Sequence, residues 1–150
     1  MNTPPIEAPI LILEDCDEDF DTAWEGFRRA GYAGRLLRAH SGDDCLDLLL
    51  AQSGAAGQCP LLVLLDLNTP GRDGRDALRE IKADPRLRQL PVIVLTTSAN
   101  PRDLQLCYES GANAYHVKPV RFPDHLALLQ QIFAYWLGST VLPPGPEQTR

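Results

Sequence analysis

Several acidic, hydroxyl and basic side chains stand directly after short apolar runs, at positions suited to chemistry on a phosphoryl group. Glu14 and Asp15 follow the first such run, and Asp66 follows the third. Thr96 follows the fourth run and Lys118 the fifth. Carboxylates brought into one pocket repel one another and therefore need a cation. Mg²⁺ is the natural choice because it is a hard ion that prefers oxygen ligands.

Phosphoryl transfer to a carboxylate requires a nucleophile, a metal, a cationic side chain and a hydroxyl donor. Asp66 is the best candidate for the nucleophile because it follows the most apolar run. Lys118 offers the fixed positive charge, and the backbone carbonyl of Asn68 could complete the metal shell. A single carboxylate at a strand end is often only a helix cap or a solvated loop residue. The prediction therefore depends on the combination.

Short apolar runs alternate with segments of helical periodicity along the whole chain. Strands are expected at 10–13, 36–39, 61–65, 92–95 and 114–117. Helices are expected at 20–27, from Ser41 toward Gly54, around 77–81 before Pro85, from Asn100 toward Gly111, and from Phe122 to Leu137. This order predicts a doubly wound parallel sheet with helices on both faces. Because functional groups of such sheets gather at the carboxyl ends of the strands, the side chains above should share one crevice.

The motifs resemble those of the receiver domains of two-component response regulators. The resemblance rests on Glu14-Asp15, on LLDLNTPGRDG at 64–74, on Thr96 and on Lys118-Pro119. It covers nearly all of the stretch 10–137. It implies the flavodoxin-like receiver fold, with five parallel strands in the order 2-1-3-4-5.

The resemblance also implies a role for each site residue. Asp66 would accept a phosphoryl group from a histidine kinase, and Thr96 and Lys118 would grip that group. Mg²⁺ would be bound by four residues: Glu14, Asp15, Asp66 and the carbonyl of Asn68. The Lys118–Pro119 peptide bond would be cis. Such a chain is a phosphoacceptor signalling protein, not an enzyme with a separate substrate.

A narrower resemblance concerns the standalone response regulators that accompany bacterial phytochromes. The similar segments are LLDLN, DPRLRQLPVIVLTTS at 84–98 and YWL at 135–137. This resemblance implies a phytochrome-type photoreceptor kinase as the partner.

The signal is expected to leave through the surface of the fourth helix, fifth strand and fifth helix. A phosphoryl group carries about two negative charges and would draw the Thr96 hydroxyl inward. Tyr115 is the candidate reporter of that change, although a Tyr at this position equally suits static packing beside the fourth helix.

The last helix carries two adjacent apolar stripes at helical spacing, one of Leu126, Leu129, Phe133 and Trp136 and the other of Leu128, Ile132 and Tyr135. One stripe suffices to cover the sheet. The other predicts a homodimer, with Phe133, Trp136 and Leu137 at the interface. The alternative is a fully packed helix followed by a disordered tail. At 150 residues the chain suits a single domain, with a core at about 8–137, a tail or dimer arm at 138–150 and no output domain.

Composition excludes several function classes. A net charge of −6 without a long basic run disfavours nucleic acid and anionic membrane as partners. No apolar stretch approaches the length of a membrane span, and no secretory pattern is present, so we expect a cytoplasmic protein with free thiols.

The acidic group at positions 17, 18, 19 and 21 is interpreted as a solvated helix start in preference to a ligand set. His40, His116 and His125 form no set.

Three alternatives share parts of this pattern. A haloacid-dehalogenase-type phosphatase needs a second acid two residues after the nucleophile, where this chain has Asn68. A flavodoxin-like flavin binder needs a hydroxyl- and glycine-rich loop after the first strand, where Glu14 and Asp15 would repel phosphate. A receiver-like module that is never phosphorylated stays possible, and phosphoryl uptake distinguishes it.

Overall fold

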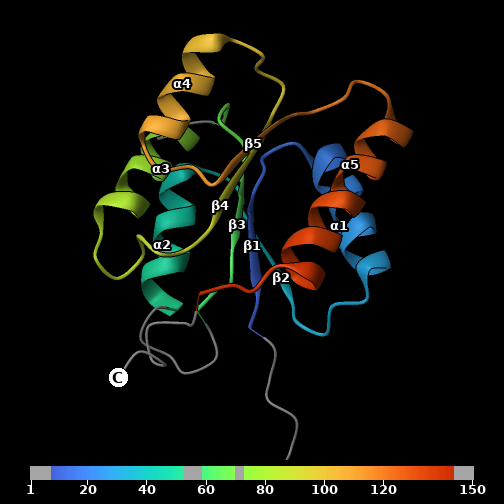
Figure 1. Ribbon diagram of the computed structural model, residues 1–150, viewed down its shortest axis with the longest axis horizontal. Coiled ribbons are helices and arrows are strands. Elements are labelled where there is room, and N and C mark those ends of the chain that lie inside the picture. The colour runs from blue at the N-terminus through green and yellow to red at the C-terminus, as the bar shows by residue number, and fades with distance from the viewer. Residues whose placement is uncertain (1–7, 53–58, 70–72, 144–150) are drawn as a thin grey trace, which may run out of the picture.

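The fold is a single parallel sheet between two layers of helices, as seen in a computed structural model (Figure 1). The structure describes residues 8–52, 59–69 and 73–143. The strands are β1 (Ile10–Leu13), β2 (Leu36–Ala39), β3 (Val63–Leu65), β4 (Val92–Thr96) and β5 (Ala114–Val117). The helices are α1 (Asp17–Ala30), α2 (Gly42–Gln52), α3 (Gly74–Ala83), α4 (Pro101–Glu109) and α5 (Phe122–Ala134), followed by the π-helical turn η1 (Tyr135–Ser139).

All four strand pairs are parallel, and the sheet order is β2-β1-β3-β4-β5. This confirms the predicted fold class and strand order. Because β1 and β3 are adjacent at the centre, the residues that follow them meet at one edge of the sheet. The third strand is shorter than predicted and begins at Val63, although Leu61 and Leu62 already hydrogen-bond through their backbones to Pro9 and Leu11.

The sheet separates two apolar clusters, because alternate residues of each strand point to opposite faces. Leu11 and Leu13 belong to the cluster covered by α2, α3 and α4. Ile10 and Ile12 belong to the cluster covered by α1 and α5. Figure 1 shows the two helical layers on either side of the strands. The two clusters share no residue.

Local sequence signals explain where several helices begin and end. The side chain of Asp73 accepts hydrogen bonds from two backbone N–H groups at the start of α3, and the side chain of Asn100 accepts one at the start of α4. The hydroxyl of Ser41 accepts the N–H of Asp44, as the side chain of an N-cap residue does. Gly31 ends α1 with φ of 73°, a conformation that favours glycine.

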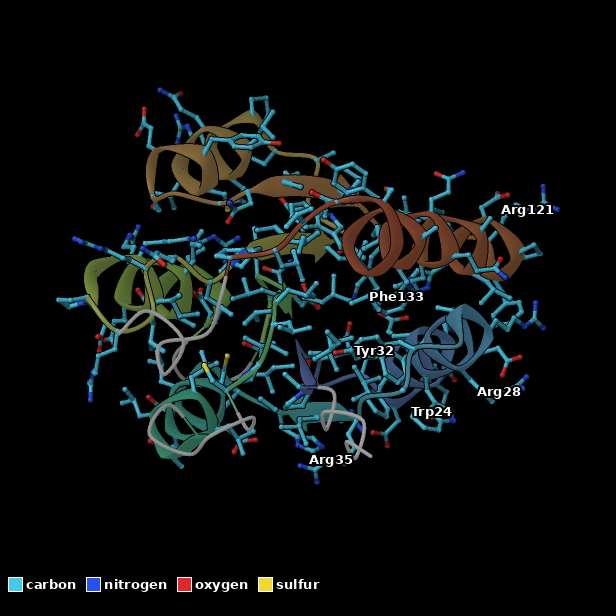
Figure 2. The ribbon with its side chains drawn as sticks, turned by 60° about the horizontal axis from the view of Figure 1, so that its bottom comes forward. Trp24, Arg28, Tyr32, Arg35, Arg121 and Phe133 are labelled. Carbon is cyan, nitrogen blue, oxygen red and sulfur yellow. The ribbon has the colours of Figure 1, made fainter. Side chains whose placement is uncertain are left out.

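The end of the chain differs from the prediction. The α-helix stops at Ala134, and η1 follows it. Ile132 and Phe133 come from the two different predicted stripes, yet both are buried. The ring of Phe133 packs edge-to-face on Phe27 of α1, with ring centroids 5.7 Å apart, and Figure 2 shows its side chain on the side of α5 toward α1. Phe133 is packed in the core of its own chain, so the structure contradicts its predicted role at a dimer interface.

Trp136 and Leu137 are half-buried against the same cluster, whereas Tyr135 is exposed. Parts of three predicted features lie outside the described residues: the end of the second helix near Gly54, positions 70–72 of the motif at 64–74, and positions 144–150 of the tail. Within the described ranges, no helix combines the length and apolarity that a membrane span requires.

Candidate phosphoacceptor site

Three carboxylates converge at the carboxyl ends of β1 and β3. Oxygen atoms of Glu14, Asp15 and Asp66 lie within 4.8 Å of one another. Glu14 is only 3% exposed and Asp66 7% exposed, while Asp15 faces solvent. A set of three carboxylates, with one side open, fits a hard cation such as Mg²⁺, which binds through oxygen and keeps several waters. The predicted convergence of these residues is thus present in the structure.

A single buried ammonium balances part of this negative charge. The Nζ atom of Lys118 lies 2.5 Å from Glu14, 2.8 Å from Asp19 and 3.1 Å from Asp66. Its backbone N–H donates to the carbonyl of Thr96 at 2.7 Å, which places the start of the β5–α5 loop beside the end of β4. The ammonium therefore ties β1, α1, β3 and β5 together at the site.

The peptide bond after Lys118 corrects one expectation. The chain has no cis peptide bond among the described residues, so the Lys118–Pro119 bond is trans and the predicted cis form is wrong. An X–Pro bond prefers trans by about 0.5–1 kcal/mol. With that bond trans, the ammonium still reaches its three carboxylates.

Burial and charge change the acidity of the groups at the site. Burial raises the pKa of Glu14 to about 7, even though hydrogen bonding to Lys118 and the positive charge of this residue act in the opposite direction. Burial alone would lower the pKa of Lys118, but its hydrogen bonds to Asp19 and Glu14 outweigh that effect and raise it. The ammonium is thus charged at neutral pH, whereas the Glu14 carboxyl titrates near pH 7.

The described residues that follow β3 lie close to the end of that strand. Gly74 begins α3, and a Cβ atom at this position would collide with the backbone carbonyl oxygen of Asp66. The N–H of Gly74 donates to the carbonyl of Leu67, and the N–H of Asn68 donates to Oδ1 of Asp66 at 3.3 Å. Asn68 therefore lies beside the Asp66 carboxylate.

Thr96 and Tyr115 lie on the β4 and β5 side of the site. Thr96 is fully buried at the end of β4, and its hydroxyl accepts the N–H of Ser98 at 3.4 Å. The hydroxyl of Tyr115 donates to the carbonyl of Ser98 at 2.8 Å. Thr96 of β4 and Tyr115 of β5 thus both hydrogen-bond to Ser98 in the loop after β4.

Sequence reasoning missed two parts of this arrangement. Asp19 was interpreted as a solvated residue, and that interpretation holds for Asp17, whose side chain is 84% exposed. The side chain of Asp19 is 31% exposed and contacts Lys118. The only sequence signal is that Asp19 lies four positions after Asp15, and its acidic neighbours give no reason to single it out.

The second missed part is a polar network on the other side of the sheet. Arg75 of α3 donates to both carboxylate oxygens of Asp103 on α4, at 2.8 and 2.9 Å. The same guanidinium reaches the carbonyl of Leu67 and the side chain of Asn68. The hydroxyl of Ser98 donates to Asp103 at 2.6 Å. The loops after β3 and β4 are therefore linked through α4, between residues 28 positions apart.

Comparison with known proteins identifies the family. Residues 10–130 match the family described as response regulator receiver domain. Response regulator Rcp1 of Synechocystis sp. is 36% identical over 135 residues, which cover 89% of this chain and 92% of Rcp1. The probable methanogenesis regulatory protein FilR2 of Methanothrix harundinacea is 39% identical over 137 residues, covering 91% of this chain and 88% of FilR2.

Solved structures agree with the sequence matches. The crystal structure of the phosphorylated cyanobacterial phytochrome response regulator RcpA superposes with a TM-score of 0.86 at 31% identity, covering 92% of this chain and 99% of RcpA. The Mn²⁺-bound form of Rcp1 superposes with a TM-score of 0.84 at 35% identity, covering 91% of this chain and 99% of that one. The chain therefore belongs to the response regulator receiver family and is related to the phytochrome response regulators.

Proposed function

We propose that Asp66 accepts a phosphoryl group from a histidine kinase, with assistance from Mg²⁺. The observation that carries this proposal is the position of the Asp66 carboxylate. It is buried, contacts an ammonium at 3.1 Å and lies within 4.8 Å of two further carboxylates. The Asp66 carboxylate thus offers a nucleophilic oxygen next to a positive charge and belongs to a candidate metal-binding set.

The chemistry of uptake follows from these groups. A carboxylate oxygen of Asp66 forms a bond to phosphorus as the bond from phosphorus to the donor nitrogen or oxygen breaks. Mg²⁺, bound by Glu14, Asp15, Asp66 and the carbonyl of Asn68, would neutralise charge on the transferred group. Lys118 neutralises the remaining charge. The hydroxyl of Thr96 is the donor expected to turn toward the phosphoryl oxygens.

Two observations support Mg²⁺ as the cofactor. The ligand set contains only oxygen donors, which suits a hard ion. The related Rcp1 has been crystallised with Mn²⁺ bound, and Mn²⁺ is a divalent ion suited to similar oxygen ligands.

Labelling with a small phosphodonor such as acetyl phosphate tests this function. The parent should label in the presence of Mg²⁺ and lose labelling with a chelator. Asp66→Asn should abolish labelling, whereas Asp76→Asn, an exposed position on α3, should label like the parent. Labelling of the Asp66→Asn variant at the parental level would refute the assignment.

We also propose that the signal leaves through the surface of α4, β5 and α5. Exposed apolar side chains lie on all three elements: Leu104, Tyr108, Val117 and Phe122. Tyr115 is half-buried on β5 and bonded to the loop after β4, so a movement of Thr96 would reach it through Ser98. NMR with a beryllofluoride-type mimic tests this, and an unmoved Tyr115 would exclude it from the switch.

The proposed partners are a phytochrome-type kinase and a second copy of this chain, in the cytoplasm. Similarity to RcpA supports the kinase class. Trp136 and Leu137, half-buried at the end of the last helix, remain the proposed dimer contacts. Sedimentation should show a dimer that Trp136→Ala weakens and that Trp24→Ala, at an exposed Trp of α1, leaves intact. A monomeric parent would refute the dimer.

A further inference from the structure

We propose that Asp19 is a positioning residue for Lys118 and thereby sets the rate of phosphoryl uptake. This inference rests on the proposed function of Asp66. It starts from the three carboxylates around the Lys118 ammonium, of which Glu14 and Asp66 also belong to the candidate metal set. Asp19 does not belong to that set. It comes from the first turn of α1.

Metal binding changes what each carboxylate can do. Mg²⁺ held by Glu14 and Asp66 would compete with Lys118 for their oxygen atoms, and the two cations would repel each other across a few ångströms. With Mg²⁺ bound, those two contacts of the ammonium would weaken, and one carboxylate partner outside the candidate metal set would be left. That partner is Asp19, at 2.8 Å.

The position of this remaining partner determines where the ammonium stays. A Lys side chain is flexible, with a compact charge and three donor hydrogens. A hydrogen bond donated by Lys118 to Asp19 would hold that charge within reach of Asp66 while Mg²⁺ competes for the other two carboxylates. Asp19 thus acts through Lys118 and does not touch the reacting atoms.

Asp19→Asn tests the inference because it removes the charge and keeps nearly the same shape. Uptake from acetyl phosphate at saturating Mg²⁺ should slow by roughly tenfold, the scale of one charge-assisted hydrogen bond. Asp21→Asn is the matched control, since it removes the same charge from an exposed position of the same helix. Asp19→Glu should restore part of the rate. Thermal unfolding of each variant verifies that the fold is retained.

A double variant separates positioning from a merely structural effect. If Asp19 acts through Lys118, Asp19→Asn should add no further slowing in a Lys118→Ala background. The inference fails if Asp19→Asn labels as fast as Asp21→Asn, or faster because a negative charge has been removed. It fails equally if the two changes are additive.

A failure of the proposed function of Asp66 can be distinguished from a failure of the proposed role of Asp19. A parent that does not label at Asp66 overturns the proposed function and this inference with it. A parent that labels at Asp66, together with an Asp19→Asn variant of parental rate, overturns the inference alone.

Discussion

Replacing Lys118 by Met tests whether one ammonium holds the acidic site together. Met fills a similar volume without charge, so the change leaves Glu14 and Asp66 buried beside Asp19 with no cation. Breaking a buried ion pair by removing one partner typically costs about 3 to 5 kcal/mol. We expect a loss of that size in the free energy of unfolding of the metal-free protein at about pH 8, a large share of the roughly 5 to 15 kcal/mol of an ordinary domain.

The loss should shrink in acid, because Glu14 has a pKa raised from 4.5 to about 7. An acid with a raised folded-state pKa contributes stability that is complete below its unfolded value and is lost as the pH rises through its folded value. At about pH 5.5 Glu14 is already largely protonated in the parent, so Lys118 has one fewer charge to neutralise. The penalty of the variant should then be smaller by about 1.5 to 3 kcal/mol, the contribution of one hydrogen bond to a charged group.

Urea unfolding with a chelator at the two pH values measures both effects. Added Mg²⁺ should stabilise Lys118→Met more than the parent, because no ammonium competes for the carboxylates. Lys82→Met is a matched control: this ammonium bonds two backbone carbonyls and Asn113, with no carboxylate among those partners. Equal penalties for Lys118→Met at the two pH values, unaffected by Mg²⁺, would refute the reasoning.

Three further predictions concern the metal, the core and the loop after β3. Mg²⁺ affinity should fall as the pH is lowered through about 7, because Glu14 must lose its proton to bind, and calorimetry in buffers of different ionisation enthalpy should detect the released proton. Phe133→Ala should cost about 3 to 5 kcal/mol in urea unfolding, as for a buried ring in a core, and a loss below about 1 kcal/mol would contradict its burial. Gly74→Ala should weaken both stability and Mg²⁺ binding, because its methyl group displaces the Asp66 backbone; calorimetry giving parental Mg²⁺ affinity would contradict this.

The predictable part of the fold and site followed from topology. Once strands and helices alternate, Glu14, Asp66 and Lys118 must meet at one edge, whatever their distance in sequence. Strand ladders and caps depend on local composition, which is why Asn100 and Ser41 began helices where expected.

The unpredicted part depends on side-chain packing between elements. Periodicity separates two stripes on the last helix, but α1 packs so closely that Ile132 and Phe133 are both buried. Nothing local distinguishes Asp19 from its acidic neighbours, and only the position of Lys118 selects it. The pairing of Arg75 with Asp103 likewise depends on the approach of α3 and α4, which no local pattern encodes.

The separation of the core into two clusters has a consequence for how this protein can change over evolutionary time. Substitutions under α1 and α5 meet none of the residues that pack under α2, α3 and α4, so each layer can be repacked without compensation in the other. Surfaces on opposite sides of the sheet can therefore diverge toward different partners at independent rates. Polar groups from both layers reach the strand ends around Asp66, so only this region must remain compatible with substitutions in both layers.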